Sequence, residues 1–270
     1  MFVLGCDRAY LYAHPERELA EEEQSRYDEV LAQRARGVPS QYITGHQEFW
    51  GLDLLVTPAV LIPRPETEHL VETVLELARP VSKAKIVDVG TGSGCVALAL
   101  AHELKDASIY GVDLSADALE IARANAARLQ LERVKFVQGN VLVACDGIPS
   151  GAAEASSRGT TAESTHFHDL DFVVSNPPYV GLDEADKVQR SVKEFEPGVA
   201  VFAGEHGLDV IRPLIDQAHS ALKPGGWLAM EIGYSMRDAV LELLYPTMWE
   251  QTRVVPDLQG IPRVIAAQKK

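Results

Sequence analysis

The stretch that decides the fold is Lys85-Ile86-Val87-Asp88-Val89-Gly90-Thr91-Gly92-Ser93-Gly94. An apolar run typical of a buried strand ends in glycines at alternate positions, and a second apolar run follows from Cys95 to Glu103. Glycines let the backbone turn sharply and approach a ligand closely, where the N–H groups of a following helix face outward. The stretch therefore predicts a buried strand, a ligand-binding loop and a helix.

The same alternation of strand and helix continues toward the C-terminus. It is typical of a doubly wound α/β sheet with right-handed crossovers. The last two runs flank Gln259-Gly260 and predict an antiparallel pair at the end of the sheet. The predicted strands are 85–89, 108–113, 134–138, 172–175, 227–232, 252–256 and 264–268, and the predicted helices are 95–103, 117–130, 208–222 and 236–244.

Two segments precede this main domain, which we place at 66–270. Residues 1–40 are charged and predict a helical segment, with one helix from Glu16 to Arg36. Residues 41–65 are richer in β-forming side chains and predict a hairpin that links this segment to the main domain. The main domain then opens with a helix that runs to about Arg79, and Glu66 and Glu68 fall in its first turn.

One segment interrupts the alternation, at residues 146–170. Small and polar residues dominate it, so we expect a flexible insertion at the surface of the sheet. His166 and His168 with Asp169 have the chemistry to chelate a metal ion, but a loop of this composition is a poor scaffold for such a site. We therefore predict no metal site.

Composition limits the classes of function. The 270 residues are 46% hydrophobic and 24% charged, as in ordinary globular proteins, and the net charge is −14. Such acidity argues against a broad nucleic-acid surface, which needs Lys and Arg, and is compatible with a basic protein partner. The cysteines (Cys6, Cys95 and Cys145) lack metal or redox spacing, and no apolar run approaches the ~18 residues of a membrane span. We expect a cytosolic monomer.

A second motif, Val173-Val174-Ser175-Asn176-Pro177-Pro178-Tyr179-Val180, ends the predicted strand 172–175. Proline fixes φ and donates no N–H, so the strand must end here in a stiff loop. In such a loop the side-chain oxygen of Asn176 and the carbonyl of Pro177 can point into one space and hold both hydrogens of a planar –NH2 group. Tyr179 is expected to lie against that group. The alternative is a proline-rich strand end without chemistry.

Side chains at the ends of neighbouring strands indicate the cofactor. Asp113 ends a predicted strand 19 residues after Gly94, where a carboxylate can accept both ribose hydroxyls of an adenosine-type cofactor. The glycine loop carries no P-loop lysine, which favours S-adenosylmethionine over a nucleoside triphosphate. We expect Gly90, Thr91, Gly92, Ser93 and Gly94 to hold the methionine part, Asp113 the ribose, Asn140 and Val141 the adenine, and Asn176 to lie beside the sulfonium.

This adjacency predicts a mechanism. An amide nitrogen is a poor nucleophile because its lone pair is delocalised. Two acceptors that hold its hydrogens, on Asn176 and Pro177, would favour a pyramidal nitrogen positioned in line with the methyl group. The predicted reaction needs neither an acid–base pair nor a metal.

With these motifs in view, the chain resembles the peptide chain release factor N5-glutamine methyltransferases, the PrmC or HemK family. The resemblance runs from about Asp7 to the C-terminus outside the insertion. The motifs that carry it are Tyr42-Ile43-Thr44-Gly45 with Glu48-Phe49-Trp50-Gly51, Ile62-Pro63-Arg64-Pro65-Glu66-Thr67-Glu68, Asp88 to Gly94, Asn176 to Tyr179, and Glu196-Pro197 with Gly204-Glu205-His206-Gly207-Leu208-Asp209.

The resemblance implies methylation of the glutamine in the Gly-Gly-Gln loop of bacterial class I release factors. It also implies a seven-stranded sheet, mostly parallel with an antiparallel end, and an N-terminal helical domain that docks the protein substrate. Asn176, Pro177, Pro178 and Tyr179 would be catalytic and, with Arg64 and Glu66, would bind the substrate. Two features depart from the family pattern: the N-terminal helical domain looks shortened, and Asn140 stands where an acidic residue is usual.

Three other functions remain open at this stage. The first is that of a related enzyme, which methylates a glutamine of a ribosomal protein. The motif sequence Arg64-Pro65-Glu66-Thr67 favours a release factor as the substrate. An adenine-N6 methyltransferase shares Asn-Pro-Pro-Tyr but would need a basic groove or a target-recognition domain. The non-enzymatic alternative is a scaffold that binds the cofactor and no substrate.

Overall fold

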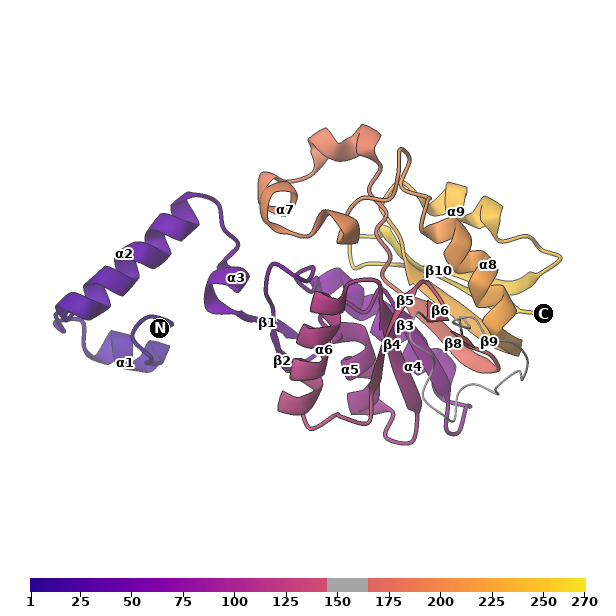
Figure 1. The fold of residues 1–270 in the computed structure, drawn as a ribbon, viewed down its shortest axis with the longest axis horizontal. Helices are drawn as coiled ribbons and strands as arrows, with labels where there is room; N and C mark the ends of the chain where they lie inside the picture. The colour runs from indigo at the N-terminus through magenta and orange to yellow at the C-terminus, as the bar shows by residue number, and fades with distance from the viewer. Residues whose placement is uncertain (145–164) are drawn as a thin grey trace, which may run out of the picture.

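The computed structural model describes residues 1–144 and 165–270. Its centre is a sheet (Figure 1), and the order of the strands in this sheet is β10-β11-β9-β8-β3-β4-β5-β6-β7. Neighbouring strands are parallel from β9 to β5, whereas β10 and β11 are antiparallel. The main strands are β3 (Lys85–Val89), β4 (Ser108–Asp113), β5 (Lys135–Asn140), β8 (Leu170–Ser175), β9 (Leu222–Glu231), β10 (Trp249–Pro256) and β11 (Pro262–Lys269).

The predicted seven-stranded sheet with an antiparallel end is thus confirmed. Two strands of two residues each, β6 (Val143–Ala144) and β7 (Thr165–His166), continue it beyond β5. Parallel strands place their carboxyl ends at one edge of the sheet, so the loops that follow β3, β4, β5 and β8 converge there. This edge is where ligands bind in open α/β sheets.

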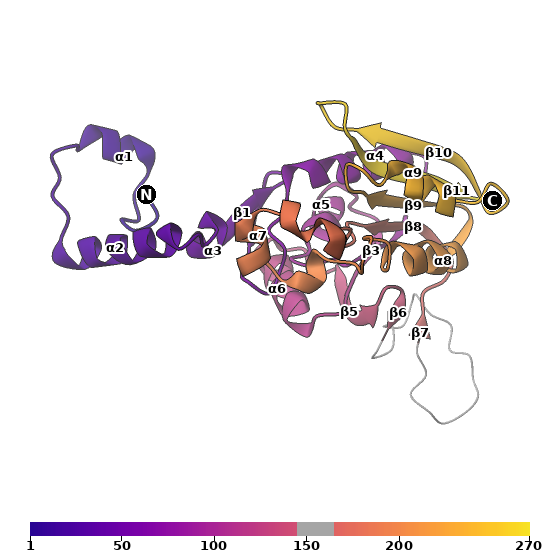
Figure 2. The ribbon, with the colours of Figure 1, turned by 90° about the horizontal axis from the view of Figure 1, so that it is seen from above.

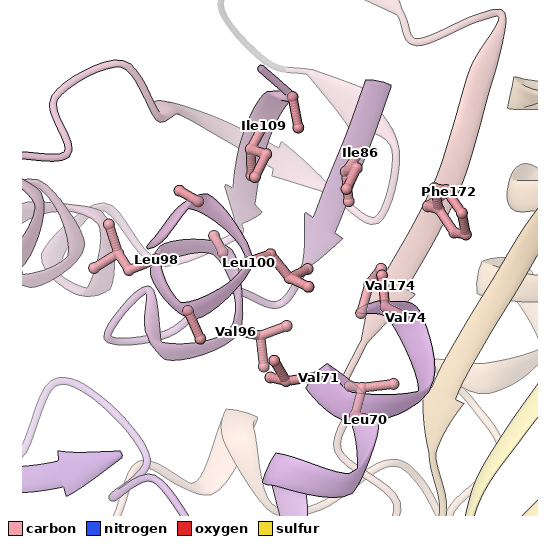
Figure 3. Packing of buried hydrophobic residues seen from close by; sticks show 14 of the residues in the cluster. Leu70, Val71, Val74, Ile86, Val96, Leu98, Leu100, Ile109, Phe172 and Val174 are labelled. Atoms are coloured by element: carbon pink, nitrogen blue, oxygen red, sulfur yellow. The ribbon is translucent and has the colours of Figure 1, made fainter. Parts of the chain in front are cut away.

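Helices cover both faces because strand side chains alternate between them. The helices α4 (Glu68–Ala78), α5 (Cys95–Glu103) and α6 (Ala116–Arg128) contribute to the core on one face. The helices α8 (Ile211–Ala221) and α9 (Arg237–Leu243) contribute to the core on the other face. Figure 3 shows the first core, in which Leu70, Val71 and Val74 of α4 and Val96, Leu98 and Leu100 of α5 pack with Ile86, Ile109, Phe172 and Val174 of the strands.

The N-terminal helices extend away from the sheet (Figures 1 and 2). They are α1 (Arg8–Ala13) and α2 (Glu21–Ala35), and neither has a buried residue. The helix that we predicted from Glu16 begins at Glu21, because the Glu23 carboxylate accepts the N–H of Ala20 at 3.0 Å and caps the helix there. No helix in the described part of the chain combines the length and apolar content needed to cross a membrane.

The linker between these helices and the sheet contains both helix and hairpin. Its first residues form a short helix, α3 (Ser40–Thr44), where we expected β-structure. The strands β1 (His46–Phe49) and β2 (Leu52–Leu55) then pair around Trp50 and Gly51, whose φ values are 55° and 70°. Two central residues with positive φ suit the right-handed twist of a tight hairpin.

The predicted insertion at 146–170 lies largely outside the described residues. Its last residues differ from the prediction. Thr165 and His166 form β7, Phe167 is buried, and Leu170 is the first residue of β8. The two apolar side chains, Phe167 and Leu170, account for this, because they join the core beneath α8 and α9.

Candidate active site

A cavity of about 340 Å³ lies at the carboxyl ends of the parallel strands. The loops after β3, β4, β5 and β8 contribute to its wall, together with residues of the linker. Four predicted site residues do not line it: Glu66, Gly94, Pro177 and Tyr179. The predicted site residues that do line it are Arg64, Gly90, Thr91, Gly92, Ser93, Asp113, Asn140, Val141, Asn176 and Pro178.

The glycine loop is held by the neighbouring strand. The N–H groups of Gly90 and Thr91 donate to the carbonyl of Val112 at 2.8 and 3.0 Å. The buried carboxylate of Asp88 accepts the Thr91 hydroxyl at 2.7 Å and the N–H of Ala97 at 3.2 Å, which joins the loop to α5. Burial raises the pKa of Asp88 to about 7, although both hydrogen bonds oppose the rise. Hydrogen bonds within the chain therefore hold the loop in this shape.

The next two strands contribute the polar groups opposite this loop. Asp113 accepts the N–H groups of Gly92 and Ser115 at 2.8 and 2.9 Å, and burial raises its pKa. Asn140 ends β5 and Val141 follows it, with a φ of 56°. A β-branched residue rarely adopts this conformation, and such strain is typical of functional sites.

Asn176 follows β8 and has a partner in the short helix η1 (Pro65–Thr67) at the start of the main domain. Its Nδ2 donates to Oγ1 of Thr67 at 3.1 Å, which leaves Oδ1 as the end of the amide that can accept. The hydroxyl of Tyr179 instead donates to Oε1 of Glu231 at 3.2 Å. Tyr179 lines a second cavity, of about 360 Å³, together with Asp183 and other residues.

The two charged residues predicted to bind substrate already face other side chains. Arg64 forms an ion pair with Glu196, whose Oε2 accepts the N–H of Ile62 at 3.1 Å. This pair ties the linker to Glu196-Pro197, and Pro197 lines the first cavity. Glu66 lies near Glu231 and Arg263. Burial is the main cause that raises the pKa of Glu231, and Asp257 is the main cause that raises the pKa of Arg263; Glu66 adds to both rises.

Four residues that build this site had no predicted role in it, although Thr67 and Gly207 belong to the motifs that carry the family resemblance. Thr67 and Glu231 lie behind Asn176 and Tyr179. Asn125 of α6 is fully buried, donates to the carbonyls of Leu55 and Ser93, and accepts the N–H of Leu55. Gly207 packs so closely on Tyr179 that an added Cβ would lie 2.2 Å from the Tyr179 carbonyl oxygen. The sequence signals for the other two residues were a lone Glu at the end of an apolar strand, Glu231, and a lone Asn in an Ala-rich helix, Asn125.

Comparison with known proteins agrees with this geometry. A family model described as the PrmC N-terminal domain matches residues 1–45, and one described as a methyltransferase domain matches residues 80–146. A methyltransferase structure from Pyrococcus furiosus is similar in fold, with a TM-score of 0.51, 14% identity, and coverage of 93% of this chain and 99% of that one.

Two relatives are described as release factor glutamine methyltransferases. The relative from Koribacter versatilis is 54% identical over 100% of this chain and 88% of its own length. The relative from Moorella thermoacetica is 40% identical over 97% of this chain and 86% of its own length. Identity of this degree over nearly the whole chain confirms the resemblance drawn from the motifs: the chain belongs to the family of release factor glutamine methyltransferases.

Proposed function

We propose that this methyltransferase transfers the methyl group of S-adenosylmethionine to the side-chain amide nitrogen, N5, of the glutamine in the Gly-Gly-Gln loop of bacterial class I release factors. The observation that carries the proposal is the position of Asn176. It lines the cavity beside the glycine loop, and its Nδ2 is occupied by Thr67, so that Oδ1 can accept from a substrate amide.

The donor groups of the cavity fit this cofactor. Gly90 to Ser93 would hold the methionine part, Asp113 the ribose, and Asn140 with Val141 the adenine. Arg64, the one Lys or Arg side chain among the described lining residues, is paired with Glu196. A wall without a free cation suits a ligand without phosphates. The cofactor supplies an electrophilic methyl group on a sulfonium.

The substrate amide would be held by Asn176 Oδ1 and the carbonyl of Pro177. Two fixed acceptors for its two hydrogens restrain the nitrogen and direct its lone pair at the methyl group. Preorganised polar groups of this kind act without reorganisation at the moment of reaction. After transfer the nitrogen loses one proton to solvent, so the chain need not provide a base. We infer a cytosolic monomer whose partner is the release factor.

Transfer of a labelled methyl group to four substrates tests the proposal. They are a purified release factor, its Gly-Gly-Ala loop variant, a glutamine-methylated ribosomal protein in its unmodified form, and duplex DNA. The expected result is label on the first substrate alone. Label on the ribosomal protein or on DNA instead would identify one of the other enzymes, and cofactor binding without any transfer would identify a scaffold.

A further inference from the structure

A buried carboxylate pairs with the cation on the wall of the first cavity. Arg64 is the one Lys or Arg side chain among the described residues that line this cavity. Its Nη2 forms an ion pair with Oε1 of Glu196. The Glu196 side chain is 2% exposed, and the Arg64 side chain is 34% exposed. Because a guanidinium stays charged in proteins, the charge of Arg64 is balanced at this wall by Glu196.

Backbone contacts hold both members of this pair in place. Oε2 of Glu196 accepts the N–H of Ile62 at 3.1 Å, two residues before Arg64. The carbonyl of Arg64 accepts the N–H of Thr67 at 3.0 Å, and the Thr67 hydroxyl accepts from Asn176 at 3.1 Å. Arg64 is therefore joined through one residue to Asn176, which we expect beside the sulfonium.

The charge on this wall matters because methyl transfer changes the charge of the ligand. The bond between sulfur and the methyl carbon breaks and leaves its electron pair on sulfur, while the lone pair of the amide nitrogen forms the new bond to carbon. The sulfonium cation thereby becomes the uncharged thioether of S-adenosylhomocysteine. An unbalanced guanidinium would repel the cofactor but not the sulfur of its product. Its effect would reach across a cavity of about 340 Å³, because the screening length is about 8 Å at physiological ionic strength.

We propose that Glu196 is a specificity-determining residue, which balances the charge of Arg64 so that the cavity retains its affinity for the cationic cofactor relative to the product. The proposal rests on the cofactor assigned in the proposed function. Glu196 itself is not among the described lining residues, so it acts through the charge of Arg64 and not by contact with the ligand. The consequence for the reaction is weaker inhibition by the product.

The first test compares the binding of the two ligands by calorimetry, without release factor. Glu196→Gln keeps the shape of the side chain and an acceptor for the Ile62 N–H, but leaves Arg64 without an anion. We expect the Kd of S-adenosylmethionine to rise about three- to tenfold relative to that of S-adenosylhomocysteine, a size that allows for the partial exposure of Arg64. Glu196→Asp keeps the charge and should keep the ratio of the two Kd values. Glu196→Ala serves if the glutamine variant does not fold.

Two further measurements separate charge from structure. Arg64→Gln added to Glu196→Gln removes the cation as well, and should return the ratio of the two Kd values to near that of wild type. The change of ratio in Glu196→Gln should also shrink as the salt concentration rises, because ions screen the interaction. A purely structural role of the pair would weaken both ligands alike and leave the ratio unchanged.

Asp171 offers a matched control at the opposite edge of the sheet. Like Glu196, it is a buried carboxylate that accepts a backbone N–H, that of Lys85 at 2.8 Å, and forms an ion pair with a cation, Lys223. These three residues lie near the amino ends of β8, β3 and β9, and they are not among the described residues that line the cavity. Asp171→Asn should therefore leave the ratio of the two Kd values unchanged.

The outcomes distinguish this proposal from the proposed function. A folded Glu196→Gln protein with an unchanged ratio would overturn the proposal and leave the proposed function standing. A change of the same size in Asp171→Asn would overturn it as well, because the effect would then not belong to the cavity wall. Wild-type protein that binds neither ligand would contradict the proposed function, and this proposal with it.

Discussion

The carboxylate of Asp113 accepts a hydrogen bond from the N–H of Gly92 at 2.8 Å, and both residues line the cavity. Its other oxygen accepts the N–H of Ser115 at 2.9 Å. One side chain at the end of β4 therefore holds the glycine loop in place. Because a carboxylate has about four accepting positions, Asp113 can still bind two hydroxyls of a ligand.

Asp113→Ala should weaken the binding of S-adenosylmethionine, both by removing this acceptor and by freeing the Gly92 N–H. Each hydrogen bond to a charged group contributes about 1.5–3 kcal/mol, so the Kd measured by calorimetry should rise at least ~10-fold. Asp113→Asn, which retains one acceptor, should lose less affinity. Unchanged affinity in a folded Asp113→Ala protein would show that this carboxylate does not contact the cofactor.

Asp88 predicts a pH dependence of stability. Its folded pKa is raised to about 7, whereas an aspartate in an unfolded chain titrates near ~3.9. Between these values the folded chain retains a proton that the unfolded chain releases, so this contribution to the free energy of unfolding falls as the pH rises toward 7 and is level above it. Asp88→Asn cannot titrate. The wild-type unfolding free energy minus that of the variant should decline over this window, and a constant or rising difference would contradict the assignment.

The hydrogen bonds of Asn125 predict that this side chain stabilises the fold, although it does not line the cavity. Asn125→Ala would leave the Leu55 N–H and the Leu55 and Ser93 carbonyls without their partner. Leaving a buried polar group unpaired costs about 1–3 kcal/mol, so the free energy of unfolding should fall by at least that amount. Glu120→Ala, on the exposed side of the same helix, is the control and should change it by less than ~0.5 kcal/mol. Equal effects would mean that Asn125 does not join the hairpin to the glycine loop.

The close packing of Gly207 on Tyr179 predicts that a larger residue at position 207 lowers kcat. An alanine there meets the carbonyl of Tyr179, whereas an alanine at Gly45, which also has positive φ, meets nothing within 4 Å. Both substitutions should cost the ~1–2 kcal/mol of a left-handed backbone in an L-residue. Only Gly207→Ala should also lower kcat, because it displaces the segment that carries Asn176. Similar kcat values in the two variants would contradict this link.

The sequence was sufficient to predict the sheet because each main strand is a short apolar run with its own boundaries, as in Lys85–Val89. It also indicated most of the cavity wall, since Asp113, Asn140 and Asn176 each follow such a run. It did not reveal the side chains that form hydrogen bonds with Asn176 and Tyr179. Thr67 matters because of Asn176, 109 residues later, and no local pattern records that contact.

The same limit explains the position of Tyr179. We expected its ring to lie against the substrate amide, as its place after two prolines suggested. Its hydroxyl bonds Glu231 on β9, 52 residues further along the chain. That partner becomes a neighbour only when β8 and β9 pair, so the direction of the side chain is set by tertiary structure. Whether the ring also contacts a bound substrate stays a prediction.

The central claim is that Asn176 holds the substrate amide, and kcat of Asn176→Ala with release factor tests it most directly. Loss of one preorganised polar contact that matters most in the transition state predicts a ~10²–10³-fold lower kcat, with the Kd of S-adenosylmethionine changed far less. Asn176→Asp, which keeps an acceptor, should retain part of the activity. If Asn176→Ala keeps near-wild-type kcat, and only its melting temperature falls, then Asn176 merely ends a strand and the catalytic account is wrong.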